Sequence, residues 1–168
     1  MNKVENIRLT EMTAEQMQSF FKGFTYDSDT FADITQCVPY IYDPQAVDAY
    51  YNKHKQQGKL HFAIMLDNDV IGDMYLKQMD CVKKSCAFGI HLINDSVKNK
   101  GYGTIAEELL LSHLFNELKM EKVLADCLIK NQRSQHVLKK VGFTEIMRDK
   151  TYVYFECDRN VWSAQKQV

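Results

Sequence analysis

Residues 98–104 read Lys-Asn-Lys-Gly-Tyr-Gly-Thr, and this stretch decides how the rest of the chain is interpreted. It follows an apolar, strand-like segment at residues 85–93 and opens a helical period that begins at Thr104. The glycines allow the backbone to approach a ligand without a Cβ clash, and the first amides of a helix can face one anion together. Lys98 and Lys100 add positive charge nearby. The stretch therefore predicts a loop that binds an anionic group.

Ala106 extends the glycines to G-x-G-x-x-A, which is also the pattern of a dinucleotide-binding Rossmann unit. In that fold the glycines follow the first strand almost directly, and an acidic residue lies near the end of the next strand. Here seven residues separate Ile93 from Gly101, and one hundred residues precede the loop glycines. Asp126 could supply the acidic side chain, but only about forty residues follow it, too few for a doubly wound sheet. The context therefore argues against a Rossmann domain.

The whole chain has the size and composition of one globular domain. Its 168 residues are 45% hydrophobic and 26% charged, so we expect a single domain over residues 1–168. The formal net charge of −1 provides no overall field for nucleic acid, and no apolar run approaches the roughly 20 residues that cross a membrane. Five cysteines without a C-x-x-C pair predict reduced thiols in a cytoplasmic protein, with no disulfide framework and no metal site. We therefore expect no nucleic acid, membrane or metal as a partner.

Working outward from the loop, the apolar patterns predict a mixed succession of strands and helices. Upstream, Thr13 and Gln16 form a capping-box pattern that starts one helix, and Asp43 with Pro44 starts another. The complete prediction comprises strands at residues 4–9, 61–66, 70–79, 85–93 and 123–129, helices over 13–23, 43–58, 104–118 and 134–141, and a pair of strands or one bent strand over 146–157. The segment 25–42 is too long for a plain turn and is a candidate functional loop.

Two motifs together resemble the GNAT superfamily of acetyl-CoA-dependent N-acetyltransferases. Residues 98–104 resemble its pyrophosphate loop, R/Q-x-x-G-x-G/A, with Lys98 in the first position. Residues 131–134 (NQRS), followed by 137–143 (VLKKVGF), resemble the N-x-x-S…GF segment of the ribosomal-protein N-terminal acetyltransferase branch. The predicted order of elements over residues 4–157 is similar too. The resemblance implies an α/β (α+β) GNAT fold, a mixed central sheet whose parallel strands 85–93 and 123–129 splay apart, flanked by helices.

The resemblance also implies acetyl-CoA as cosubstrate, without a metal. Its pantetheine arm would lie between the splayed strands, paired with the backbone of Leu92, Ile93 and Val97 and contacted by Asn131 and Ser134. Backbone amides would hold the pyrophosphate, namely those of Lys98, Asn99, Lys100, Gly101, Tyr102, Gly103 and Thr104.

The reaction implied is direct attack of a neutral primary amine on the thioester. Many relatives have a tyrosine four residues before the last glycine of the motif as the acid, but Leu138 stands there, so Ser134 is the candidate acid or, alternatively, the N-cap of its helix. Ala87 stands where relatives often have a glutamate base. The candidate bases are His91, Tyr152, Tyr154 and Glu156, and a base that acts through water is the alternative. Cys127 offers an acyl-cysteine route, although a buried cysteine is usually only a small hydrophobe.

The acceptor is expected at the loop 25–42, which roofs the cleft in this fold. Its charged and aromatic residues suit a cationic small-molecule amine or a peptide N-terminus, and they are Asp27, Asp29, Asp33, Tyr26, Tyr40 and Tyr42. A homodimer is an open possibility for the assembly. The alternative function is a non-catalytic acyl-CoA-binding module, because the usual tyrosine and glutamate positions are not kept.

Overall fold

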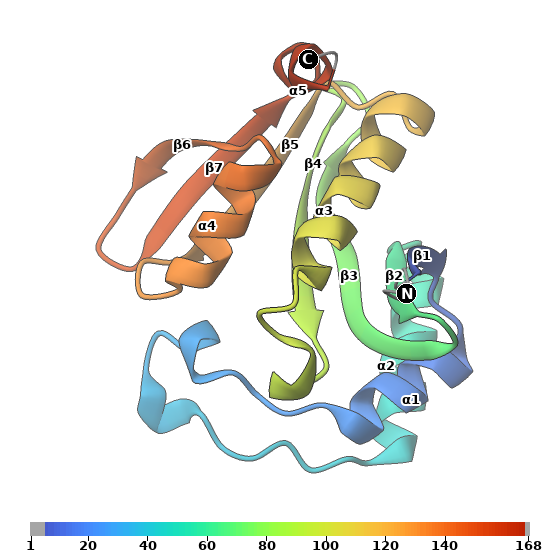
Figure 1. Ribbon diagram of the computed structural model, residues 1–168. Coiled ribbons are helices and arrows are strands. Elements are labelled where there is room, and N and C mark those ends of the chain that lie inside the picture. The colour runs from blue at the N-terminus through green and yellow to red at the C-terminus, as the bar shows by residue number, and fades with distance from the viewer. Residues whose placement is uncertain (1–5, 167–168) are drawn as a thin grey trace, which may run out of the picture.

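One mixed sheet of seven strands forms the centre of the protein, seen in a computed structural model that describes residues 6–166 (Figure 1). The order across the sheet is β1-β2-β3-β4-β5-β7-β6. The strands are β1 (Ile7–Glu11), β2 (His61–Leu66), β3 (Asp69–Asp80), β4 (Ser85–Leu92), β5 (Lys122–Leu128), β6 (Thr144–Arg148) and β7 (Tyr152–Asp158). Residues 4 and 5 of the first predicted strand lie outside the described residues, and the strand reaches Glu11. The C-terminal segment forms two strands, one of the two alternatives predicted.

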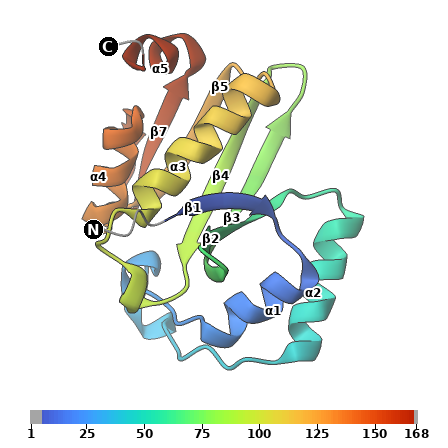
Figure 2. The ribbon, with the colours of Figure 1, turned by 45° about the vertical axis from the view of Figure 1, so that its right-hand side comes forward.

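Helices cover both faces of this sheet. They are α1 (Ala14–Gly23), α2 (Pro44–Gln56), α3 (Tyr102–Ser112), α4 (Gln132–Val141) and α5 (Arg159–Gln165), and a π-helical turn at His113–Glu117 extends α3. On the face of the sheet that α1 and α2 cover, Met17, Phe20 and Val47 are buried against β2 and β3. The α3 side forms the larger core, in which Leu110 and Leu114 are fully buried. Figure 2 shows α1 and α2 together beside β1–β3, away from α3 and α4.

The sequence signals explain where the helices begin. Thr13 and Gln16 form the predicted capping box of α1, and the Asp43 carboxylate accepts hydrogen bonds from the first amides of α2. The helix α3 begins at Tyr102, two residues before the predicted start, because Gly101 serves as its N-cap with φ of 84°. The short helix α5 was not predicted.

The parallel strands β4 and β5 are paired over three residue pairs only, Ser85–Lys122, Cys86–Val123 and Ala87–Leu124. Beyond Ala87, β4 stays paired with β3 as far as Leu92, whereas β5 stays paired with β7 as far as Leu128. The two strands therefore diverge in the lower part of Figure 1. The mixed sheet with splayed parallel strands that the sequence predicts is confirmed.

Among residues 6–166, no helix combines the length and the apolar character needed to cross a bilayer.

Candidate active site

Two adjoining cavities follow the divergence of β4 and β5. The larger, about 580 Å³, runs from the N-terminus of α3 to that of α4 and beneath the segment between α1 and α2. The smaller, about 190 Å³, lies between the splayed strands. Six residues line both cavities, namely Thr30, Ile90, His91, Glu107, Asn131 and Ser134. The cavities therefore form one cleft, which we call the splay cleft.

The N-terminus of α3 forms one end of the splay cleft. Gly101 is its N-cap and has no side chain, so the N-cap residue makes no side-chain hydrogen bond to the first turn. At Gly103, no atom other than those of its chain neighbours and its own helix backbone lies within 4 Å of the position that a Cβ would take. A helix N-terminus without a side-chain cap, the positive end of the helix dipole and a glycine that leaves room for close approach together suit a diphosphate.

Most of the residues that the sequence assigns to the cosubstrate line the larger cavity. They are Leu92, Val97, Lys98, Asn99, Gly101, Tyr102, Gly103, Thr104, Asn131 and Ser134. Lys100 and Ile93 do not line it. The Ile93 amide donates to the Ile71 carbonyl at 2.8 Å, and the Ile93 carbonyl accepts from the Thr25 amide at 2.9 Å. The Ile93 amide is therefore already paired within the sheet, and the predicted backbone pairing of Ile93 with pantetheine stays a prediction for its carbonyl, which can accept a second hydrogen bond.

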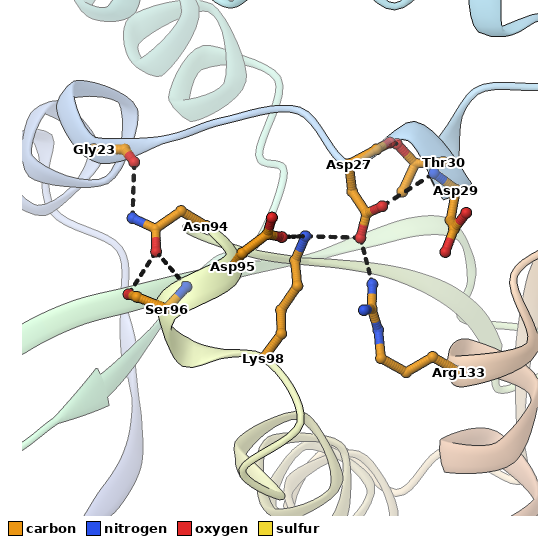
Figure 3. A network of polar contacts seen from close by, with 9 residues as sticks. All are labelled: Gly23, Asp27, Asp29, Thr30, Asn94, Asp95, Ser96, Lys98 and Arg133. Carbon is orange, nitrogen blue, oxygen red and sulfur yellow. Dashed lines mark hydrogen bonds and ion pairs between the residues drawn. The ribbon is translucent and has the colours of Figure 1, made fainter.

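Asp27, in the segment between α1 and α2, contacts both segments that the sequence assigns to cosubstrate binding, residues 98–104 and residues 131–134 (Figure 3). The Lys98 Nζ donates to Asp27 Oδ2 at 2.8 Å and to Asp95 Oδ1 at 2.6 Å, and Arg133 binds the same Asp27 oxygen. The Lys98 side chain is only 7% exposed. Burial alone would raise the pKa of Asp27, but the hydrogen bonds from Lys98 and the Asp29 amide, with the charges of Lys98 and Arg133, lower it below its usual value. We call Asp27, Asp95, Lys98 and Arg133 the Asp27 cluster.

The cluster corrects the expectation for the acidic residues of the loop. The Asp27 carboxylate already balances two cations, so it is not free to attract a cationic acceptor. Asp33 accepts hydrogen bonds from the amide and the hydroxyl of Thr35, and neither Asp29 nor Asp33 lines the splay cleft. Of the three tyrosines only Tyr26 lines the cleft, within an aromatic group that includes Tyr40.

Replacing Asp27 by asparagine should lower the melting temperature at pH 7 by about 2–4 °C, because the loop loses its ion pairs to Lys98 and Arg133. The lowered pKa means that this stabilisation is complete at neutral pH and is lost as the pH falls through that value. Asp29→Asn is the control, and the measurement is thermal denaturation from pH 7 to well below pH 3.8, the ordinary pKa of the Asp27 carboxyl. Equal melting temperatures for the two variants at pH 7 would refute the stabilising role.

His91 lies where the two cavities meet. Burial lowers the pKa of its imidazole, the charge of Asp73 opposes this, and the charge of Lys77 adds to it. The ring stacks on Tyr75 at a centroid distance of 5.8 Å. A neutral imidazole in this place can accept a proton at physiological pH.

The other candidate bases occupy different surroundings. Tyr152 lines the smaller cavity but not the larger one. The Tyr154 hydroxyl donates to Asp149 Oδ2 at 2.9 Å, and Glu156 accepts from Lys122 at 2.9 Å. Neither Tyr154 nor Glu156 lines the splay cleft.

Ser134 reaches the cleft from the first turn of α4. The N-cap is Asn131, whose Oδ1 accepts from the Ser134 amide at 3.1 Å, so the capping alternative for Ser134 is wrong. Burial raises the pKa of the Cys127 thiol, and the neighbouring Ser134 hydroxyl opposes this only in part. A protonated thiol is a poor nucleophile, which disfavours the acyl-cysteine route.

Several cleft residues were missed from the sequence, among them Glu107 and His136. Glu107 is 3% exposed and lines both cavities, and His136 lines the larger one beside Lys140. The sequence does indicate that Glu107 faces inward, because Glu107 has the helical spacing of the apolar residues Leu110, Leu111 and Leu114. A carboxylate at an inward position is unusual and could have been singled out.

Comparison with known proteins identifies the family. Residues 6–144 match the family model described as "Acetyltransferase (GNAT) domain", and the chain belongs to this family. It is 27% identical over 128 residues to the uncharacterized N-acetyltransferase YnaD of Bacillus subtilis, covering 71% of this chain and 69% of YnaD. It is 22% identical to the protein named "Putative ribosomal N-acetyltransferase YdaF" of Bacillus subtilis, covering 95% of this chain and 88% of YdaF.

Solved structures share the fold. Spermidine N-acetyltransferase from Vibrio cholerae, in complex with CoA and spermine, has a TM-score of 0.78 at 14% identity, covering 94% of this chain and 98% of that one. A GNAT-family acetyltransferase from Bacillus anthracis has a TM-score of 0.75 at 20% identity, covering 94% and 98%. The splayed sheet therefore belongs to the GNAT fold.

Proposed function

We propose that the protein transfers an acetyl group from acetyl-CoA to a primary amine by direct attack in the splay cleft. The observation that carries the proposal is the continuity of this cleft, from the N-terminus of α3, which has no side-chain cap, to the gap between β4 and β5. The family supports the reaction class. The amides that begin α3 would hold the diphosphate, and Leu92, Val97 and Asn131 would line the path of the pantetheine arm.

In this proposal the two sides of the cleft have different tasks. His91 accepts the proton that the amine loses, and its lowered pKa keeps it neutral for this purpose. The acceptor enters the smaller cavity, where Tyr75, Tyr152 and the Lys77–Asp126 ion pair (2.8 Å) provide polar contacts. The acceptor class is a primary amine, either a small molecule or a peptide N-terminus. All five cysteines are free, which supports a reducing, cytoplasmic setting.

Release of free thiol from acetyl-CoA in the presence of a panel of amines tests the function. We expect turnover with at least one amine, and we expect His91→Gln to lower kcat by about 100-fold, because general-base catalysis contributes that much or more. The wild-type rate should fall as the pH drops through the lowered pKa of His91, and the variant should lack this dependence. Acetyl-CoA binding without turnover for any amine would instead support the acyl-CoA-binding module.

A further inference from the structure

Glu107 is a buried carboxyl group without a full set of partners. It lies on α3, is 3% exposed, and its Oε2 atom has neither solvent nor a hydrogen-bond partner. Its inward-facing neighbours on the helix, Ala106, Leu110 and Leu111, are fully buried and apolar. The next residue, Glu108, behaves in the ordinary way, since it is partly exposed and pairs with Lys166 at 3.3 Å.

Such a group destabilises the fold, because burying a polar atom without a hydrogen-bond partner costs free energy. Burying an apolar side chain at the same position would not carry this cost. A leucine at position 107 would continue the apolar face of α3. Residues that break a local rule in this way concentrate at functional sites. The position of Glu107, where the larger and smaller cavities meet, agrees with such a role.

The protonation state of Glu107 follows from its surroundings. Burial raises the pKa of this carboxyl to about 8, and no charged neighbour contributes. The side chain is therefore mainly a neutral acid at pH 7, able to donate a proton. Ser134, the acid expected from the sequence, has a hydroxyl that is a far weaker acid than a carboxyl group.

We propose that Glu107 is the catalytic acid that protonates the coenzyme A sulfur during acetyl transfer. The assignment rests on the proposed function. Coenzyme A whose diphosphate lies at the first amides of α3 and whose pantetheine arm continues between β4 and β5 would pass the place where the two cavities meet. Glu107, Ser134 and Asn131 line that place. The usual tyrosine position is Leu138, which cannot supply a proton.

The proton balance of the step is complete. The amine nitrogen forms a bond to the acetyl carbon, the carbon–sulfur bond breaks, and its electron pair goes to sulfur. Glu107 gives its proton to that sulfur and becomes a carboxylate, while the proton lost by the amine passes to His91. A thiol has an ordinary pKa near 8.5, close to that of Glu107, so the transfer is nearly balanced in free energy. Solvent restores both protonation states after the products leave.

Kinetics of Glu107→Gln provide the first test, because glutamine keeps the size and a hydrogen-bond donor but cannot release a proton. We expect kcat to fall about 100-fold, with KM for acetyl-CoA changed by less than about threefold. The wild-type kcat should decline above pH 8 as Glu107 ionises, and the variant should lack this decline. Glu108→Gln is the matched control and should retain wild-type kinetics. A wild-type kcat in Glu107→Gln would overturn the assignment.

Binding provides a second readout that does not depend on turnover. Calorimetry with coenzyme A and with desulfo-coenzyme A compares ligands that differ only at the sulfur. Glu107→Leu should weaken coenzyme A about fivefold, as for one lost hydrogen bond, and leave desulfo-coenzyme A unchanged. Equal weakening of both ligands would show a packing role and overturn the assignment. Failure of the wild-type protein to bind coenzyme A would overturn the proposed function and this assignment with it, whereas normal turnover by Glu107→Gln would overturn this assignment alone.

Discussion

Replacing Gly103 by phenylalanine should raise the Kd for coenzyme A by about 100-fold or more, equivalent to roughly 3 kcal/mol. Gly103 lies in the first turn of α3 and lines the larger cavity. Apart from its chain neighbours and its own helix backbone, no atom lies within 4 Å of the position of a Cβ there, so the substitution places no Cβ against another part of the fold. Its ring would occupy the space through which a diphosphate reaches the helix amides.

The same substitution should leave the fold intact, and thermal denaturation is the check. Gly103 has no left-handed backbone conformation, and replacing a helical glycine gains up to about 1 kcal/mol of helix propensity. Ile105→Phe is the control, because Ile105 lies on the same helix, is 41% exposed and does not line the splay cleft. Unchanged coenzyme A affinity in a folded Gly103→Phe variant would show that the diphosphate binds elsewhere.

Raising the pH should destabilise the wild-type protein relative to Glu107→Leu. The folded-state pKa of Glu107, about 8, exceeds its ordinary value of 4.5, so the folded state holds the proton more tightly than the unfolded chain does. The stabilisation of the folded state by this tighter proton binding is complete below pH 4.5 and is lost as the pH rises to about 8. The full shift corresponds to about 5 kcal/mol.

Urea denaturation at pH 5 and pH 9 measures this difference. The advantage of Glu107→Leu over the wild type should be larger at pH 9 than at pH 5, whereas Glu108→Gln should track the wild type at both. A difference between Glu107→Leu and the wild type that does not change with pH would mean that Glu107 titrates normally in the folded protein.

The main elements could be read from the sequence because their signals are local. The capping residues Thr13 and Asp43 start their helices as predicted, and the hairpin strands β2 and β3 lie where the apolar runs place them. The helix α5 was missed because its seven residues, with Trp162 as the one buried member, are too short to show a helical period.

The sequence could predict only those site residues that belong to short local motifs. Loop glycines and Asn131 belong to short patterns, and they line the cleft as expected. The partners of Asp27 are 71 and 106 residues away in the chain, so no local pattern could show that its charge is already balanced. The hydrogen bond from the Ile93 amide to the Ile71 carbonyl was hidden for a similar reason, because it joins residues that are distant in the chain.

The parallel strands β4 and β5 are joined by three residue pairs only, and this short junction affects how the sequence of the cleft can change. Each half of the sheet keeps its own ladder of hydrogen bonds, β1–β4 on one side and β5–β7 on the other. Tyr75 and Lys77 belong to one half, and Asp126 and Tyr152 to the other. Below the junction no backbone pairing joins β4 to β5, so outside the Lys77–Asp126 ion pair a mutation on one wall needs no compensating change in the backbone pairing of the other, and the lining of the cleft can change while the architecture persists.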